Sequence, residues 1–218
     1  MTELKSLIQK EFFPTLLSYD FVVYKNNLII KPVNNLLRGF CFDRHDNQLY
    51  VHLFIQPLYV PSTYQNLSYG WRLKGVHSLG DMFLLDDNQL ECTKAEIRSL
   101  LLSQKDILLA INTALDFHNR FLISNLKLLA HKTEVDIRHQ ETLTLTQSFI
   151  YPEKTCILVD DFLERWERDD RNHIPWMREI QNNMLLLKHC CTSNDKILEL
   201  FAKWRSTTIE KLRLTKIK

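Results

Sequence analysis

Apolar and polar residues alternate along much of residues 36–73, and this pattern constrains the fold more than any other in the chain. In residues 67–74 the odd positions are apolar or aromatic, whereas the even positions are polar or glycine. A period of two marks a strand with one buried face and one solvated face. In residues 49–55, aliphatic side chains alternate with Tyr50, His52 and Phe54, so both faces of that strand can be covered. The segment predicts an antiparallel sheet at the centre of the fold.

Glycine is scarce, with 4 residues where average usage of about 7% would give roughly 15. Phosphate-binding loops, dinucleotide fingerprints and turn-rich sandwiches need more glycine than this. The hydrophobic share of 45% and the charged share of 25% are those of an ordinary globular chain. A length of 218 residues suits one large domain or two small ones. These values favour a helix-rich chain with one modest sheet.

The first part of the chain predicts a helix followed by about five antiparallel strands. Apolar residues recur at helical spacing over residues 2–17, although Pro14 weakens the last turn. The predicted strands are residues 21–25, 28–31, 36–42, 48–60 and 67–74, with room for one more at 82–85. Asn26-Asn27 suits a two-residue hairpin turn, and residues 43–47 form the second turn. The N-terminal helix can then cover one face of the sheet.

The second part of the chain predicts antiparallel helices. Residues 93–96 read Thr-Lys-Ala-Glu, a capping-box pattern that precedes a periodic apolar run. Further helices are predicted over residues 133–149, 152–168, 175–191 and from 192 onward. We therefore predict an α+β fold. Residues 1–92 form the sheet with its N-terminal helix, residues 93–218 form the helical region, and the two pack as one compact unit.

The cysteine pattern and the chain start indicate a reducing compartment. The five cysteines are scattered and contain no CxxC pair or Cys/His ligand spacing, so we predict no structural zinc. Cys41 and Cys156 lie in apolar runs and are predicted to be small core residues. Neither a signal-peptide core nor a run of about 18 apolar residues occurs. We expect a cytoplasmic protein that does not associate with membranes.

The densest acidic stretch favours an interaction surface over a metal site. It contains six carboxylates: Asp160, Asp161, Glu164, Glu167, Asp169 and Asp170. On a helix, three of them share one face, a spacing that can hold a divalent cation. Arg165, Arg168 and Arg171 are interleaved, however, and would neutralise that face. We predict a solvated face with internal ion pairs and no metal ligand; an acidic docking surface for a basic partner is the next interpretation.

Two histidine motifs have simpler explanations than catalysis. Asp43, His45 and Asp46 can support acid–base or metal chemistry, but they lie at the predicted hairpin turn, where such side chains bond their own backbone. His118 can act as a base oriented by Asp116, yet the chain contains no GxSxG, HExxH or P-loop motif to accompany it. We predict turn chemistry for the first motif, a helix-surface or interhelix histidine for the second, and neither a catalytic residue nor a cofactor.

Aromatic and arginine side chains concentrate in the predicted sheet. Tyr50, Phe54, Tyr59, Tyr64, Tyr69 and Trp71 lie close together in sequence with Arg38, Arg44 and Arg72. Tyr, Trp and Arg are enriched at interface hot spots. Most of these aromatics are expected to be core between sheet and helix, and the remainder are candidates for partner contacts. Trp71 and Arg72 join the acidic residues as the predicted partner-binding residues.

The segment 36–73 also resembles small cytosolic immunity proteins of bacterial toxin–immunity pairs. The resemblance rests on Arg38-Gly-Phe-Cys-Phe and on Pro57-Leu-Tyr-Val-Pro61. It implies a role, the stoichiometric binding and blocking of one cognate toxin through charge and shape complementarity. No residue role is carried over from it. Our leading hypothesis is a non-catalytic protein-binding module of this kind.

The alternative hypothesis is an enzyme or a nucleic-acid-associated factor whose site is assembled from distant residues. Its materials are the acidic helix 160–170 and the basic end 196–218. That end holds seven basic residues (Lys196, Lys203, Arg205, Lys211, Arg213, Lys216 and Lys218) against Glu199 and Glu210. A net charge of +2 for the whole chain does not by itself imply nucleic acid. A basic last helix that complements its own dipole is favoured over nucleic-acid binding.

Overall fold

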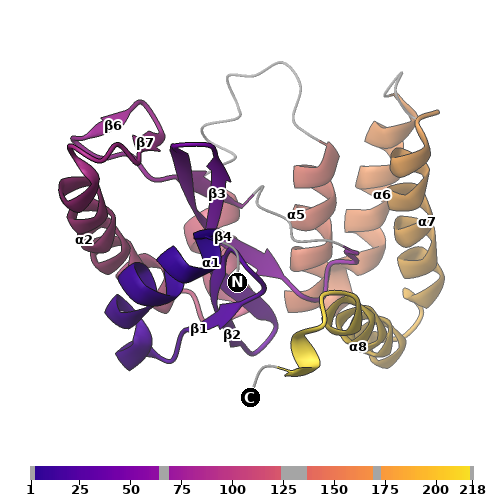
Figure 1. Ribbon diagram of the computed structural model, residues 1–218. Coiled ribbons are helices and arrows are strands. Elements are labelled where there is room, and N and C mark those ends of the chain that lie inside the picture. Colours follow the sequence, from indigo (N-terminus) through magenta and orange to yellow (C-terminus); the bar gives the residue numbers. More distant parts are fainter. Residues whose placement is uncertain (1–2, 64–68, 124–136, 169–172, 217–218) are drawn as a thin grey trace. The chain divides into compact units, whose positions relative to one another are not determined.

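The computed structural model describes residues 3–63, 69–123, 137–168 and 173–216 (Figure 1). The predicted α+β class is confirmed, with an N-terminal helix, an antiparallel sheet and a C-terminal helical half. The chain divides into two compact units. The sheet unit comprises the described residues of Met1–Gln56 and Gln65–Asn112, together with Lys216. The helical unit comprises the described residues of Pro57–Tyr64 and Thr113–Thr215.

The described residues form a seven-stranded sheet, where the sequence predicted about five strands with room for one more at residues 82–85. The strands are β1 (Val22–Tyr24), β2 (Leu28–Val33), β3 (Leu36–His45), β4 (Gln48–Pro57), β5 (Gly70–Arg72), β6 (Ser78–Leu79) and β7 (Met82–Leu84). Their order is β1-β2-β3-β4-β7-β6, and β5 also pairs with β4. The pairs with a recorded register are all antiparallel. The allowed strand is β7, and β6 is the one without a prediction, because its two residues are too few to show a pattern.

Strand β4 carries two different partners along one edge. Its first residues, Gln48 and Leu49, pair with β7, and the stretch from His52 to Phe54 pairs with β5. Because β5 and β7 lie end to end on β4, residues 20 or more positions apart in sequence come together beside it. This arrangement builds the polar cluster described below.

Both hairpin turns differ from the predicted ones by one or more residues. Tyr24 pairs with Leu28, so the first loop contains three residues, and the positive φ falls on Lys25 (54°) and not on either asparagine. Strand β3 continues to His45, which leaves only Asp46 and Asn47 for the second turn. Asp46 takes the left-handed conformation there (φ 54°), as the short aspartate side chain allows.

The predicted N-terminal helix is broken into several helical turns. It comprises α1 (Glu3–Leu7), a π-helical turn (Ile8–Phe12), and 3-10 turns at Phe13–Thr15 and Leu17–Tyr19. Pro14 lies in the first of these 3-10 turns, where its missing N–H prevents the regular helical pattern from continuing. The Phe12 ring stacks on the Phe42 ring of β3, with centroids 5.4 Å apart. This contact places the N-terminal segment against the sheet.

Helix α2 (Leu90–Leu109) belongs to the sheet unit, and a buried arginine anchors its end. Arg38, on β3, is 1% exposed and donates from one guanidinium nitrogen to the carbonyls of Leu108 (2.6 Å) and Ile111 (2.7 Å). Carbonyls at a helix C-terminus lack intrahelical partners and carry partial negative charge, so a buried cation satisfies both needs. Burial lowers the pKa of the Arg38 guanidinium.

The capping-box prediction at residues 93–96 is wrong. Helix α2 already begins at Leu90, and Thr93 is buried within it. The Glu96 carboxylate instead accepts hydrogen bonds from the backbone N–H groups of Val76 and His77, the latter at 3.0 Å. The residue that resembled a cap therefore fastens the loop before β6 to the helix.

The helical unit contains α3 (Ala114–Phe117), a π-helical turn (His118–Leu122), α5 (Ile137–Ile150), a 3-10 turn (Pro152–Lys154), α6 (Thr155–Glu167), α7 (Pro175–Cys190), α8 (Asn194–Lys211) and a last 3-10 turn (Leu214–Lys216). Each helix from α5 to α8 packs against the next one along the chain: α5 contacts α6, α6 contacts α7 and α7 contacts α8. Helix α8 also contacts α5. The helices predicted to start at Pro152, Pro175 and residues 192–195 are confirmed.

The segment after β4 belongs to the helical unit and not to the sheet. The Tyr59 hydroxyl donates to Thr146 Oγ1 of α5 at 3.0 Å, and its ring stacks on Phe149 with centroids 4.4 Å apart. Leu58 and Val60 on either side are also buried. The chain therefore leaves the sheet unit at Pro57, returns for β5 to α2, and leaves again at Thr113. The sequence instead predicted a division between residues 92 and 93, where strands give way to helices. The observed units differ because they are defined by packing contacts, which place helix α2 in the sheet unit and Tyr59 in the helical unit.

Candidate functional site

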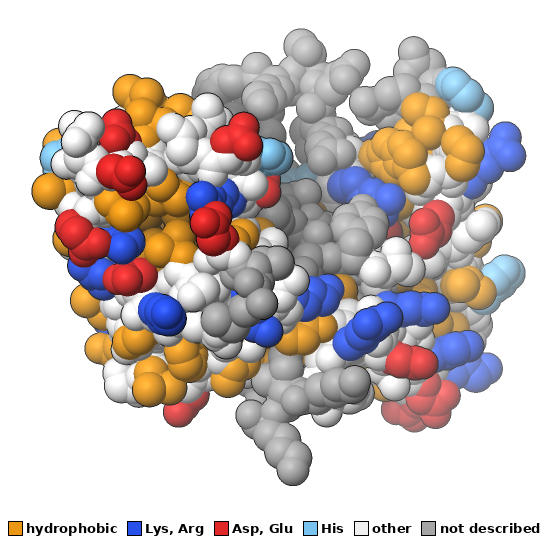
Figure 2. All heavy atoms as spheres, in the orientation of Figure 1, with side chains coloured by type: hydrophobic (Ala, Val, Ile, Leu, Met, Phe, Trp, Pro, Cys, Tyr) orange, Lys and Arg blue, Asp and Glu red, His pale blue; other side chains and the backbone are white. Residues whose placement is uncertain are grey.

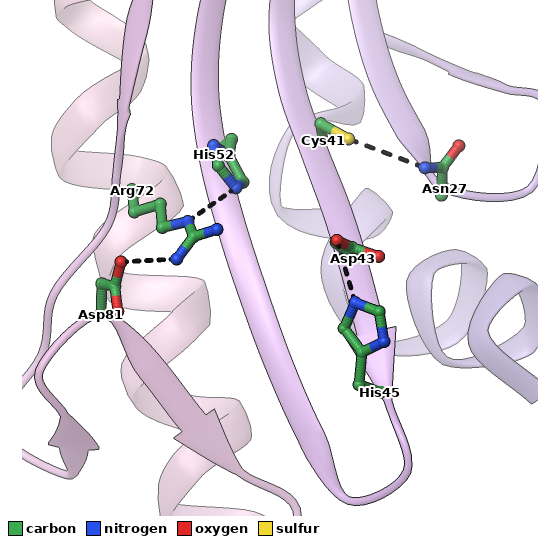
Figure 3. Close-up of polar contacts among 7 residues, drawn as sticks. All are labelled: Asn27, Cys41, Asp43, His45, His52, Arg72 and Asp81. Atoms are coloured by element: carbon green, nitrogen blue, oxygen red, sulfur yellow. Dashed lines mark hydrogen bonds and ion pairs between the residues drawn. The ribbon is translucent and has the colours of Figure 1, made fainter.

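The most organised polar surface of the sheet unit is centred on Arg72 of β5 (Figure 3). The Arg72 guanidinium donates to Asp81 Oδ2 at 2.9 Å and, through Nε, to His52 Nε2 at 3.1 Å. It also lies over the Tyr50 ring, 4.5 Å from its centroid. We call Tyr50, His52, Arg72 and Asp81 the Arg72 cluster. Three neighbours hold a side chain that is still 43% exposed, so its charge is both fixed and accessible.

The protonation state of His52 follows from its partner. Arginine Nε can only donate, so His52 Nε2 must accept, and the ring proton of the neutral tautomer lies on Nδ1. Burial lowers the pKa of His52, the positive charge of Arg72 lowers it further, and Asp43 and Asp81 oppose these effects. The hydrogen bond from Arg72 likewise lowers the pKa of Asp81. Near neutral pH the cluster therefore holds one cation, one anion and a neutral imidazole.

The motif of Asp43, His45 and Asp46 lies only partly in the turn that the sequence predicted, because Asp43 and His45 belong to β3 and Asp46 alone lies in the turn. His45 Nε2 lies 3.3 Å from Asp43 Oδ2, and both side chains are largely exposed. Arg44 Nε donates to the carbonyl of Asp46 at 2.7 Å, closing the hairpin. The His45 ring meets the edge of the Tyr50 ring, with centroids 6.3 Å apart. The turn thus borders the Arg72 cluster without adding a nucleophile or a metal ligand to it.

The two predicted partner-binding residues of the sheet lie on opposite faces. Trp71 pairs with Leu53 and Arg72 pairs with His52, and consecutive residues of a strand point to opposite sides. Trp71 is 39% exposed, whereas its neighbours Tyr69 and Leu73 are buried. The three alternate residues of β4 differ in burial: Phe54 is fully buried, whereas Tyr50 and His52 are half-buried. Arg72 therefore shares its surface with Tyr50 and His52, and Trp71 belongs to a different one.

The acidic helix α6 is partly neutralised by ion pairs. Glu164 pairs with Arg168 one turn away, as the interleaved arginines suggested, and Asp160 pairs with Lys188 of α7 at 2.7 Å. Asp161 and Glu167 are exposed, and Asp169 and Asp170 lie outside the described residues. Nearest-neighbour patterns could reveal the first ion pair but not the second, because Lys188 comes from another helix. Asp160 and Glu164 are thus ion-paired, and Asp161 and Glu167 present exposed carboxylates on the same helix.

Asp116 does not orient His118. The Asp116 carboxylate accepts from the backbone N–H and the hydroxyl of Thr113, and Thr113 Oγ1 accepts in turn from the Asp116 N–H, a capping box for α3. His118 instead lies beside Asn119 (Nδ1 to Oδ1, 2.8 Å) and Gln147 (3.3 Å). The Thr-x-x-Asp spacing could have revealed this cap from sequence. The interhelix interpretation of His118 is thereby supported.

The helical unit contains a buried carboxyl group that no sequence pattern indicated. Glu141 of α5 is 2% exposed and accepts from Arg138 at 3.2 Å. The pKa of Glu141 is raised to about 7, mainly by burial and to a smaller extent by the negative charge of Glu179. The positive charge of Arg138 and hydrogen bonds from Arg138 and Asn183 act in the opposite direction. Its neighbours in sequence are polar, so periodicity did not identify it as an inward position.

Stability of the helical unit is expected to fall as pH rises through the range in which Glu141 titrates. The folded pKa of about 7 lies above the reference value of 4.5, so the folded state binds the proton more tightly. This contribution is fully present below pH 4.5, decreases up to pH 7, and amounts to about 3 kcal/mol in total. Urea unfolding of the wild type and of Glu141→Gln should diverge over this interval, the variant being more stable at pH 8. Glu164→Gln, at an exposed position, is the control, and parallel curves for wild type and Glu141→Gln would contradict the assignment.

Charges of both signs lie on the surface of both units. Figure 2 shows acidic and basic side chains interspersed over the unit that carries α1 and α2 and also in the region of α8. Among the described residues of α8, Lys196, Lys203 and Lys211 are exposed, and Arg205 is half-buried. Within the residues that the structure covers, no three His, Cys, Asp or Glu side chains gather as a metal site would need. Nor does any described helix combine the length and apolarity needed to cross a bilayer.

Comparison with known proteins returned no matching family model, curated protein or solved structure.

Proposed function

We propose that the chain is a non-catalytic protein-binding module that acts as an immunity protein, binding and inhibiting one cognate bacterial toxin. The observation that supports this most is the Arg72 cluster. Its arginine is exposed, yet Asp81, His52 and Tyr50 already hold the side chain in place. Binding a partner therefore costs little additional side-chain conformational entropy. Arginine and tyrosine are among the residues that contribute most at protein interfaces.

Charge complementarity favours an acidic patch on the toxin opposite this cluster. Arg72 offers donors that Asp81 and His52 do not use, because a guanidinium carries five N–H groups in a planar fork. A carboxylate of the partner can occupy those donors in a bidentate arrangement. The neighbouring Tyr50 ring supplies apolar area beside the charge. This pairing gives specificity and a fast association rate.

The direct test uses the product of the open reading frame beside this gene in its native host. Co-expression should yield a stoichiometric complex on size-exclusion chromatography, and the chain should restore growth of cells that express the neighbouring product. Recovery of a free chain that gives no protection would contradict the proposal. Heat of Mg²⁺ binding in calorimetry, or a salt-dependent gel shift with DNA or RNA, would favour the enzyme or nucleic-acid alternative instead.

Replacing Arg72 by alanine is expected to weaken the complex by about 30-fold or more, the loss typical of a hot-spot arginine. The change removes an exposed ion pair, so the stability of the free chain should fall by about 1 kcal/mol at most. Arg44→Ala is the control, because Arg44 is also an arginine of the sheet unit paired with one carboxylate, that of Glu3 at 3.1 Å, although its side chain is only 26% exposed. Surface plasmon resonance against the toxin measures both variants. Equal affinities for the two would place the contact surface elsewhere.

A further inference from the structure

Cysteines distant in sequence meet where α6 begins and α7 ends. Cys156 is the second residue of α6 and is exposed, although the sequence predicted a core position. Cys190 ends α7, and Cys191 follows it. The Cys156 thiol donates to the Cys191 carbonyl oxygen, with 3.6 Å between sulfur and oxygen. Of the two predicted core cysteines, only Cys41 is buried.

The Cys156 sulfur therefore lies against the backbone of Cys191, just after the end of α7. Burial raises the pKa of Cys191 to about 12, and its hydrogen bond with the Cys156 thiol contributes to that rise, as do the charges of Cys156, Asp160 and Cys190. Because the Cys156 sulfur contacts the carbonyl group of Cys191, the two cysteines come together from the start of α6 and the end of α7. The exposed Cys156 is the member of the pair that a dissolved oxidant reaches first.

An ion pair holds the two helix ends at this spacing. Lys188 Nζ lies 2.7 Å from Asp160 Oδ1. Asp160 is one turn after Cys156 on α6, and Lys188 is about one turn before Cys191 on α7. The hydrogen bond that Lys188 donates to Asp160 raises the pKa of Lys188, which keeps the ammonium charged. This ion pair holds the two helix ends together beside the cysteines.

We propose that Cys156 and Cys191 form a reversible disulfide when the protein meets hydrogen peroxide. The Cys156 sulfur attacks one peroxide oxygen and the O–O bond breaks, giving a sulfenic acid and one water. The Cys191 sulfur then attacks the Cys156 sulfur and displaces the hydroxyl group, which leaves with the Cys191 proton as a second water. Two thiols lose two electrons and one peroxide gains them. A dithiol reductant reverses the reaction by exchange.

Such a bond would connect helix ends 35 positions apart and act on the helical unit alone. Closing a loop of this size restricts the unfolded chain, so oxidation should raise the melting temperature by about 5–10 °C. Disulfides that form transiently in reducing compartments are usually sensing or catalytic ones. The proposal is independent of the toxin-binding function.

Mass spectrometry of the peroxide-treated full-length protein tests this assignment. The intact mass should fall by two hydrogen atoms, and trypsin should release residues 155–165 joined to residues 189–196, a product that dithiothreitol removes. Cys156→Ser and Cys191→Ser should abolish the joined product, whereas Cys190→Ser and Cys92→Ser should retain it. A joined product that persists in Cys191→Ser, or disappears in Cys190→Ser, would assign the bond to Cys190 and overturn the proposal. Stepwise addition of oxygen to Cys156 without any joined product would overturn it as well.

Discussion

An Arg38→Met chain is expected to lose about 3 kcal/mol of unfolding free energy, because two buried carbonyls lose their only charged donor. In the folded protein one nitrogen of Arg38 serves both Leu108 and Ile111, and the side chain is almost completely buried. Methionine fills much of the same space but donates no hydrogen bond. The end of α2 then keeps its partial negative charge in an environment that water does not reach.

Urea unfolding monitored by circular dichroism measures this loss, and hydrogen exchange locates it. Exchange should accelerate in the last turn of α2 and in β3, and much less in α5 to α8. Arg98→Met is the control. Arg98 is another arginine that connects α2 to the rest of the sheet unit, through an ion pair with Glu11 of the N-terminal segment at 3.0 Å, but its side chain remains partly exposed. Its cost should be about 1 kcal/mol or less. Similar losses for the two variants would show that Arg38 acts as an ordinary surface charge does.

A Gly39→Ala chain is expected to lose about 3 kcal/mol or more, at the upper end of what overpacking costs. A Cβ atom at Gly39 would lie 2.2 Å from the Ile29 carbonyl oxygen and 2.9 Å from the Ile30 Cα. Both are backbone atoms of the paired strand β2, so no side chain can rotate aside. The strands must separate, which disrupts the register that runs from Leu28 and Cys41 to Val33 and Leu36.

Gly80→Ala separates this steric effect from the general cost of replacing glycine. Gly80 has a positive φ of 68° but nothing within 4 Å of the added Cβ. Alanine there should cost about 1 kcal/mol, from backbone strain alone. Thermal unfolding should therefore order the proteins as wild type, Gly80→Ala and Gly39→Ala, from most to least stable. A Gly39→Ala chain as stable as Gly80→Ala would show that β2 and β3 can move apart freely.

Local patterns were sufficient for most elements of the fold. Alternation predicted the central strands, proline placed the starts of α7 and the turn before α6, and apolar spacing placed α8. These signals succeed because each depends on residues within one or two turns of each other. Boundaries that depend on distant contacts failed. The hairpin loop at Lys25 and the start of α2 at Leu90 are two such cases.

The candidate site was predictable only in part. Arg72 drew attention as an arginine among aromatics, but its partners His52 and Asp81 come from other strands and loops. Their meeting depends on the register of β4 against β5, and a slip of one residue would point Arg72 to the opposite face. Glu141 was missed for a related reason: its burial depends on which helices surround α5, and the polar residues beside it gave no apolar stripe.

The amino-acid sequence by itself determined the α+β class, the antiparallel strands in residues 36–73 and the helices that follow, because these depend on periodicity and on the local conformations of proline and aspartate. Tertiary structure alone decided which parts belong together. It assigned α2 to the sheet unit and Tyr59 to the helical unit, and it brought Arg38 to the end of α2 and Cys156 to Cys191. Contacts between residues tens of positions apart are set by the packing of whole elements, and no local pattern encodes them.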